Sequence, residues 1–167
     1  YSAESPGYDV MVVSVDGGEP RQLTSGIERD VAAGWLPDGS GVVVSRLGGE
    51  GELTVIAPID GSPERRLTPA LAGAQNAAIS PDGRWLAFER LGDGGSMTIW
   101  VQSYPDGEPR QLTTDGFEDP NTWTMWSPDS RRIVYTSRRT GTLDLWVSDI
   151  TTGEATQITS DVRDDDM

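Results

Sequence analysis

The side chains that most often carry catalysis are missing from this sequence. Its 167 residues include no histidine, lysine or cysteine. The chain therefore cannot build the Ser-His-Asp, Ser-Lys or Cys-His arrangements of nucleophilic catalysis, or the usual His/Cys zinc sites. Disulfides and thiolate chemistry are excluded for the same reason. Carboxylates are the reactive groups that remain.

A carboxylate pair is the one catalytic arrangement that the residue types still permit. Glycosidases use two carboxyl groups that flank the bond to be cleaved. Asp30 and Asp119 could both reach the rim where strands a begin, although nothing in their spacing pairs them. The acids at 161 and 164–166 form no calcium loop of the D-x-D-x-D-G type, so we interpret them as a solvated tail. We predict no metal, no cofactor and no catalytic activity, with a carboxylate-based glycosidase as the least favoured alternative.

The charge balance limits the partners. The chain has 13 basic residues, all arginine, against 27 acidic ones, a net charge of −14. Such a field repels nucleic acid phosphates and anionic lipids, so we predict neither nucleic acid binding nor membrane insertion. A basic protein or a cation is compatible with this charge. An acidic surface that is merely tolerated, as in a compositionally biased or high-salt source, is the favoured explanation.

Three sequence markers recur with one period. Pro37, Pro81 and Pro128 each precede an aspartate and lie 44 and 47 residues apart. An aliphatic-threonine pair recurs in phase with them, at 23–24, 67–68, 112–113 and 158–159. A glycine turn lies between the two markers in each unit. A period of 40 to 50 residues with regular turn signals is typical of β-propeller blades.

Each unit reads as four strands, named a to d in chain order. Strand a ends at the Pro-Asp turn. Strand b is rich in valine, isoleucine and aromatic residues, and strand c shows an alternating pattern of side chains, as in residues 143–147. The predicted b strands are 41–45, 84–89 and 132–137, the c strands 8–13, 97–102 and 143–147, and the middle d strand 109–113. We expect an all-β propeller of consecutive four-stranded antiparallel blades.

The first unit supplies only strands c and d, which makes 14 strands and about three and a half blades. The expected divisions are a half blade at 1–30 and blades at 31–74, 75–120 and 121–167. This is an incomplete ring with open sheet edges. The remainder of the propeller in a longer parent chain is the favoured partner. A second copy is the alternative, but it does not supply the missing a and b strands.

Residues that recur in every blade are interpreted as structural. Asp38, Asp82 and Asp129 should accept hydrogen bonds from nearby backbone amides in their turns. We expect an ion pair at the end of strand b, where arginine recurs, and packing between stacked sheets for four tryptophans. The arginines are Arg46, Arg90 and Arg138, and the tryptophans are Trp35, Trp100, Trp126 and Trp146.

The repeat resembles that of a known family. The last unit resembles the WD-like repeat of TolB-type β-propellers at residues 126–129, 132–137, 144–147 and 157–159. The same pattern is found at residues 78–113 and 34–68. The match at 34–68 departs from it at Leu36 and Thr54. Similar repeats occur in periplasmic TolB, in propellers of prolyl-oligopeptidase-like peptidases and in sensor regions of bacterial kinases. The resemblance implies the blade fold and favours the periplasm or the cell exterior, but it assigns no activity.

The connections from strand d to the next strand a differ between units, while the a–b turn is uniform. Variation at one end of a rigid scaffold is where specificity usually resides. The candidate binding rim consists of Arg29, Asp30, Gln75, Asn76, Asp119, Asn121 and Trp123; the alternative is that these are solvated loop residues. We predict a noncatalytic propeller that binds a protein, a peptide or another ligand there. The alternative is an accessory propeller that filters substrates or senses ligands for a larger enzyme.

Overall fold

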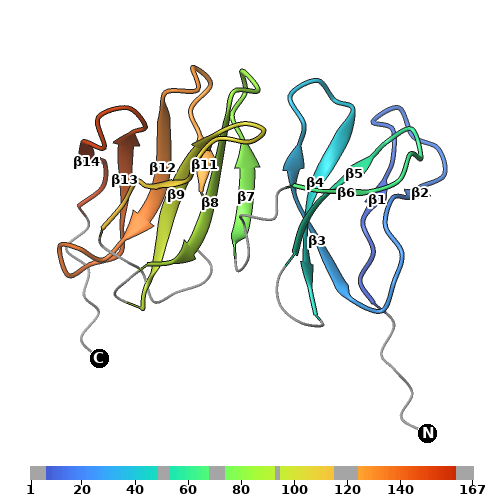
Figure 1. Ribbon diagram of the computed structural model, residues 1–167, viewed down its shortest axis with the longest axis horizontal. Helices are drawn as coiled ribbons and strands as arrows, with labels where there is room; N and C mark the ends of the chain where they lie inside the picture. Colours follow the sequence, from blue (N-terminus) through green and yellow to red (C-terminus); the bar gives the residue numbers. More distant parts are fainter. Residues whose placement is uncertain (1–6, 49–52, 68–73, 93–94, 115–123, 161–167) are drawn as a thin grey trace, which may run out of the picture. The chain divides into compact units, whose positions relative to one another are not determined.

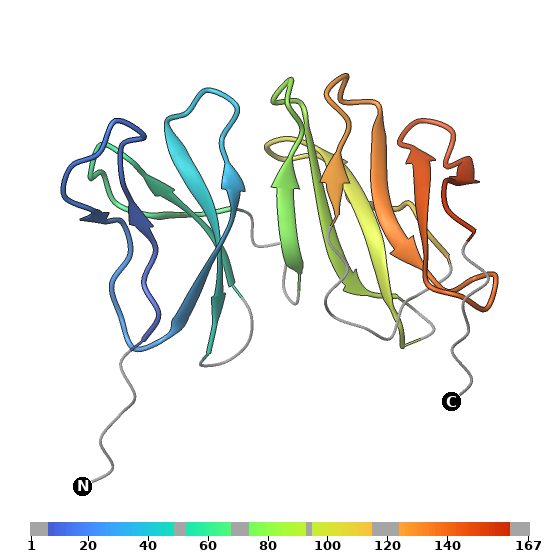
Figure 2. The same ribbon diagram turned by 180° about the vertical axis from the view of Figure 1, so that it is seen from behind.

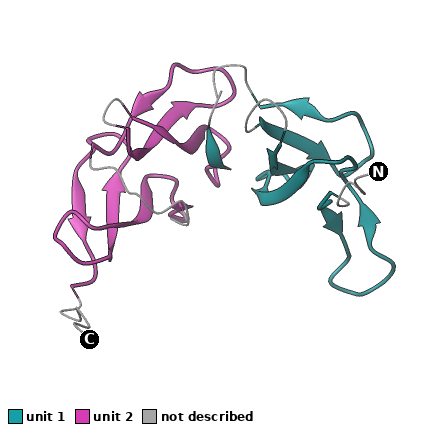
Figure 3. Cartoon of the chain, turned by 90° about the horizontal axis from the view of Figure 1, so that it is seen from below, with its two compact units in different colours: residues 1–77 teal, residues 78–167 magenta. Residues whose placement is uncertain are grey.

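The computed structural model describes residues 7–48, 53–67, 74–92, 95–114 and 124–160. These residues form strands and turns without a helix (Figure 1). Accordingly, they contain no helix that is long and apolar enough to span a bilayer. The chain divides into two compact units, residues 1–77 and 78–167, which are coloured separately in Figure 3.

Fourteen strands in the described residues form one two-stranded sheet and three four-stranded sheets. In each four-stranded sheet, strands a to d follow one another in chain order (Figures 1 and 2). The predicted blade topology is confirmed, including the half blade. The half blade is β1 (Met11–Val12) and β2 (Arg21–Gln22); the blades are β3 (Arg29–Trp35), β4 (Gly41–Leu47), β5 (Leu53–Pro58) and β6 (Arg65–Arg66); β7 (Gln75–Ile79), β8 (Trp85–Leu91), β9 (Met97–Ser103) and β10 (Arg110–Gln111); and β11 (Met125–Trp126), β12 (Arg132–Ser137), β13 (Asp144–Asp149) and β14 (Ala155–Gln157).

Position within the sheet explains the composition of the strands. The b strands lie inside their sheets, and the three consecutive valines of β4, residues 42–44, are all buried. A strand covered on both faces loses the alternation of polar and apolar residues. The d strands β6 and β10 lie at an edge, where they are short and carry charged and polar residues. Such edges resist pairing with other chains.

The Pro-Asp turns have the predicted structure. The Oδ1 atom of Asp38 accepts a hydrogen bond from the Ser40 amide at 2.9 Å, and that of Asp129 accepts one from the Arg131 amide at 3.1 Å. Asp82 accepts the Arg84 amide in the same way, at 3.1 Å. Hydrogen bonds to these three carboxylates hold each pKa below its usual value. The repeated aspartates are therefore turn residues, as expected.

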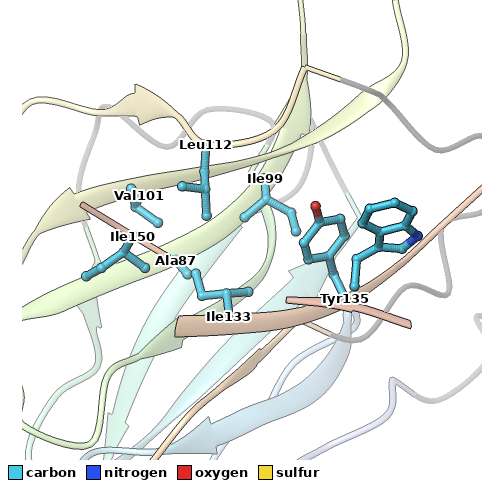
Figure 4. Close-up of a cluster of buried hydrophobic side chains, with 8 residues drawn as sticks. Ala87, Ile99, Val101, Leu112, Ile133, Tyr135 and Ile150 are labelled. Atoms are coloured by element: carbon cyan, nitrogen blue, oxygen red, sulfur yellow. The ribbon is translucent and has the colours of Figure 1, made fainter. Parts of the chain in front are cut away.

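A buried cluster joins the two blades of the second unit (Figure 4). Strands β8, β9 and the residues after β10 provide one side, and β12, β13 and the following turn provide the other. Trp146 belongs to this cluster and Trp126 packs against it, while the Trp126 indole donates to the Ala78 carbonyl at 3.0 Å. The packing role predicted for these two tryptophans is confirmed. The cluster consists of Ala87, Ile99, Val101, Leu112, Ile133, Tyr135, Trp146 and Ile150.

A smaller cluster joins the half blade to the first blade. Val10 and Leu23 pack against aliphatic side chains of β4 and β5. Trp35 does not belong to this cluster, and 56% of it is exposed. Trp35 lies opposite Val42 as Trp126 lies opposite Ile133, so the two tryptophans are equivalent. Trp126 donates to Ala78 in strand a of the preceding blade, whereas the described half blade consists of strands c and d. The packing predicted for Trp35 is therefore not found among the described residues.

The strand register also corrects one recurring position. Arg46 lies opposite Leu53, Arg90 opposite Thr98, and Ser137 opposite Asp144. Ser137, and not Arg138, therefore occupies the third equivalent position. Of the two arginines that are equivalent, Arg46 forms the predicted ion pair. Arg90 instead lies over the Trp100 ring, with Cζ 3.8 Å from the centroid, so Trp100 supports a cation–π contact.

Candidate functional site

The predicted rim lies at the ends of the blades where strand a begins and strand b ends. Antiparallel order places the d–a and b–c connections at this loop-rich end and the Pro-Asp turns at the other. Arg29 and Asp30 begin β3, and Gln75 and Asn76 begin β7. The remaining candidates, Asp119, Asn121 and Trp123, lie outside the described residues.

Asp30 is engaged in a structural ion pair. Arg46 donates two hydrogen bonds to its carboxylate, Nε to Oδ1 at 2.7 Å and Nη2 to Oδ2 at 2.8 Å. Arg46 also binds Glu64 through Nη1 at 2.9 Å. The side chain of Asp30 is only 3% exposed, so it is poorly placed to contact a ligand. Sequence reasoning identified both Asp30 and Arg46 but did not connect them.

The ion pair sets the protonation of both groups. Burial raises the pKa of Asp30, but the Arg46 hydrogen bonds and the Thr24 hydroxyl outweigh it, so the net pKa is lowered. The hydrogen bonds from Arg46 to Asp30 and Glu64 raise the pKa of the guanidinium. An aspartate held ionised in this way is unsuited to act as a general acid. This disfavours Asp30 as one half of a glycosidase pair.

Arg29 forms an exposed surface with residues that precede β1 and β3. Its guanidinium carbon lies 5.4 Å from the centre of the Tyr8 ring, and both side chains are exposed. The backbone holds Tyr8 in a parallel bridge with Arg29, in which the Tyr8 carbonyl accepts the Asp30 amide at 2.8 Å. Ile27, two residues before Arg29 in the sequence, is also exposed. We call Tyr8, Ile27 and Arg29 the Arg29 surface.

Sequence reasoning missed Tyr8 and Ile27 as members of this surface. Tyr8 was assigned to a c strand, and an aromatic residue in a strand is usually a packing residue. The one available signal was that the loop-rich end of a blade includes the start of strand c. An exposed arginine at the start of a strand, beside a tyrosine that is bridged to it through the backbone, can bind the side chains of a peptide.

Gln75 and Asn76 are half-buried at the start of β7. Asn76 has a φ of 50°, in the left-handed region. Asparagine tolerates this region better than most residues, so the sequence is adapted to a local bend. We treat this pair separately from the Arg29 surface.

The last blade carries a second arginine-aromatic contact at its loop-rich end. The Arg139 guanidinium carbon lies 4.2 Å from the centre of the Trp146 ring, and Nη2 donates to the Tyr135 hydroxyl at 2.6 Å. Asp144 accepts hydrogen bonds from Thr142 and Gln157, which ties the b–c connection to β14. Sequence reasoning missed Arg139 because it followed the neighbouring Arg138.

A metal centre is not found in the part of the chain that the structure describes. No group of three or more acidic side chains there could hold an ion. The acidic residues at 161 and 164–166 lie outside that part. Of the candidate carboxylate pair, Asp30 alone lies within the described residues.

Comparison with known proteins supports the blade fold. A family model described as the dipeptidyl peptidase IV N-terminal region matches residues 93–167. No curated protein sequence matches the chain.

Solved structures of propeller proteins are similar to most of the chain. TolB from Acinetobacter baumannii has a TM-score of 0.76 at 20% identity, over 90% of this chain and 37% of that one. The putative TolB from Agrobacterium tumefaciens has a TM-score of 0.69 at 26% identity, over 85% and 50%. A puromycin-hydrolyzing peptidase from Mycobacterium tuberculosis has a TM-score of 0.65 at 20% identity, over 86% and 26%.

The chain thus spans half or less of each of these three structures. Its repeat, its blade order and these likenesses agree. The chain forms about three and a half blades of a β-propeller, and its structure is similar to that of TolB proteins.

Proposed function

We propose that this chain is a noncatalytic β-propeller module that binds a protein or peptide at the loop-rich end of its blades. The Arg29 surface carries this proposal, because an exposed arginine lies over an exposed tyrosine ring there, and an exposed isoleucine stands two residues before the arginine. Arginine and tyrosine are enriched among the residues that dominate binding energy at interfaces. The rigid strand β3 and the backbone contacts of Tyr8 hold the surface in place.

The chemistry of the rim supports binding over catalysis. Asp30, the one described member of the candidate carboxylate pair, is held in a bidentate ion pair by Arg46. The sequence has no histidine, lysine or cysteine to replace it. The resemblance to TolB-type propellers favours the periplasm or the cell exterior as the site of action.

An accessory propeller of a larger peptidase is the second candidate. The match of residues 93–167 to the dipeptidyl peptidase IV N-terminal region favours it, as does the likeness to a puromycin-hydrolyzing peptidase. In that case the loop-rich end would filter or position substrates for a catalytic domain elsewhere. A catalytic domain joined to these blades in the natural protein would decide for this candidate.

Binding can be tested with peptides selected on the chain itself from a random display library. We expect Arg29→Ala and Tyr8→Ala each to weaken the selected peptides about 10-fold or more in calorimetric titrations. Arg131→Ala is the matched control, because Arg131 is an exposed arginine at the opposite, turn-bearing end. Equal loss in all three variants would contradict the proposal. Turnover of a glycoside by the wild-type chain, abolished in Asp119→Asn, would contradict its noncatalytic part.

A further inference from the structure

Arg90 occupies in the second blade the position that Arg46 has in the first blade, but its charge is held in a different way. The pairing of strands b and c makes the two arginines equivalent. Arg46 forms ion pairs with two carboxylates, those of Asp30 and Glu64. Within the described parts of the chain, no carboxylate lies at ion-pair distance from Arg90.

The sequence explains this difference, because both acidic positions are occupied by other residues in the second blade. The 44-residue spacing between the first two Pro-Asp turns places Ala74 at the position of Asp30. The pairing of strands c and d places Pro109 at the position of Glu64. Neither side chain has an oxygen that could accept a hydrogen bond. The second blade has thus kept the arginine without the acids that bind its equivalent.

An aromatic ring holds the Arg90 guanidinium instead. Its Cζ atom lies 3.8 Å from the centre of the Trp100 ring, and Trp100 stands where the first blade has Val55. The indole N–H donates to the Thr98 hydroxyl at 2.9 Å, and this hydroxyl donates to the Arg90 carbonyl at 3.2 Å, so the ring is tied to the strand that carries the arginine. A cation–π contact covers the face of a guanidinium and leaves the N–H groups at its edge able to donate.

The burial of Arg90 favours a carboxylate as its ligand. Arg46 and Arg90 are the only arginines of the described residues that are not exposed. Partial burial removes water that would solvate the charge, so a carboxylate gains more there than at an exposed arginine. Arg90 is the last but one residue of β8, at the loop-rich end, and part of its side chain and of the Trp100 ring remains accessible.

We propose that Arg90 and Trp100 form a binding site for a carboxylate of the partner peptide, on the side chain of an aspartate or a glutamate. The guanidinium binds the two carboxylate oxygens as Arg46 binds Asp30, while the indole ring holds it in position. This inference rests on the proposed function, because it takes the partner to be a peptide at the loop-rich end. Its residues are different from those of the Arg29 surface.

Peptides selected on the wild-type chain from a random display library test the site. We expect an aspartate or a glutamate at a recurrent position, and its replacement by the corresponding amide should weaken binding about 10-fold in calorimetric titrations. Arg90→Lys keeps the charge and loses the planar fork, so it should weaken the acidic peptide by a similar factor. Arg84→Lys is the matched control, because Arg84 is an exposed arginine at the opposite end of β8.

A double-mutant cycle joins the two changes. The amide peptide should bind the wild-type chain and Arg90→Lys with affinities within about 2-fold of each other, because both changes remove the same contact. Additive losses would place the carboxylate elsewhere and overturn the site. Displacement of the peptide by free glutamate at the concentration of the peptide would assign the site to a small carboxylate and overturn the peptide as its source.

A carboxylate built into the chain should compete with the peptide. Pro109→Glu restores the acid that the first blade has at Glu64, and it should weaken the acidic peptide about 5-fold or more, whereas Pro109→Gln should not. Both variants lose the same proline, so the comparison isolates the charge, and circular dichroism checks that both are folded. Equal affinities of the two variants would contradict the site.

The outcomes separate this site from the proposed function. Peptides that are weakened by Arg29→Ala but not by Arg90→Lys or by loss of their own carboxylate would overturn the carboxylate site and leave the Arg29 surface in place. Peptides that depend on Arg90 and on their carboxylate, but not on Arg29, would support the site and contradict the Arg29 surface. A library without binders, or binders that depend on neither arginine, would overturn both.

Discussion

Arg46 and Asp30 face each other across β4 and β3 and are joined by two parallel hydrogen bonds of 2.7 and 2.8 Å. This bidentate geometry is the strongest form of arginine–carboxylate pairing. Glu64 binds the same guanidinium from the region just before β6. One arginine therefore ties three parts of the first blade together at its loop-rich end.

Removing the buried carboxylate should destabilise the first unit. Asp30→Asn leaves the Arg46 guanidinium without its main partner, and we expect a loss of about 2 kcal/mol in the free energy of unfolding. Glu64→Gln is the control, because Glu64 is more exposed and should cost less than about 1 kcal/mol. Chemical denaturation of the three proteins measures the difference. Equal losses in both variants would contradict the assigned role of Asp30.

The ion pair between Asp30 and Arg46 should make the free energy of unfolding depend on pH in the acid range. Because the pKa of Asp30 is lowered in the folded state, the unfolded state binds more protons in the window below the ordinary value of 3.8. The contribution of Asp30 is thus present above that value and is lost as the pH falls through the lower folded pKa. Asp30→Asn should flatten the slope of unfolding free energy against pH in this window. An unchanged slope would show that other aspartates account for it.

Two substitutions of the turn residue Ser130 should distinguish the cost of backbone strain from the cost of a lost hydrogen bond. It has a φ of 60° where Gly39 and Gly83 each have 72°, and its hydroxyl accepts the Asp82 amide at 3.0 Å. Ser130→Ala keeps the strained backbone and loses this bond, so we expect it to cost about 1 kcal/mol. Ser130→Gly loses the bond but relieves the strain, and should cost less. Thermal unfolding compares the two; a more stable alanine variant would refute this explanation.

The cluster between the last two blades should be sensitive to truncation. Ile133 is fully buried in it, and Ile133→Ala should cost about 2 to 4 kcal/mol through lost burial and the cavity left behind. Val134→Ala on the same strand is the control, since Val134 is only half-buried. Urea denaturation, followed by tryptophan fluorescence, reports the change. Similar costs for the two variants would argue against tight packing at Ile133.

The repeat allowed most of the fold to be predicted. The β12 bounds were predicted correctly, and the half blade followed from counting strands. The exposure of Trp35 was not predictable from its own repeat, because it depends on the neighbouring half blade, which has only strands c and d among the described residues. The candidate rim was predicted only as a set of loop residues, of which Asp119, Asn121 and Trp123 lie outside the described part and remain predictions.

The sequence by itself determined the blade period, the strand order and the lack of histidine, lysine and cysteine chemistry. These properties depend on residue types at fixed spacing, which local turns and strand propensities translate directly into structure. Only the tertiary structure decided that Asp30 binds Arg46 and that Tyr8 lies beside Arg29. Such pairings join residues that are distant in sequence, and the register of packed strands, which no single segment encodes, brings them together.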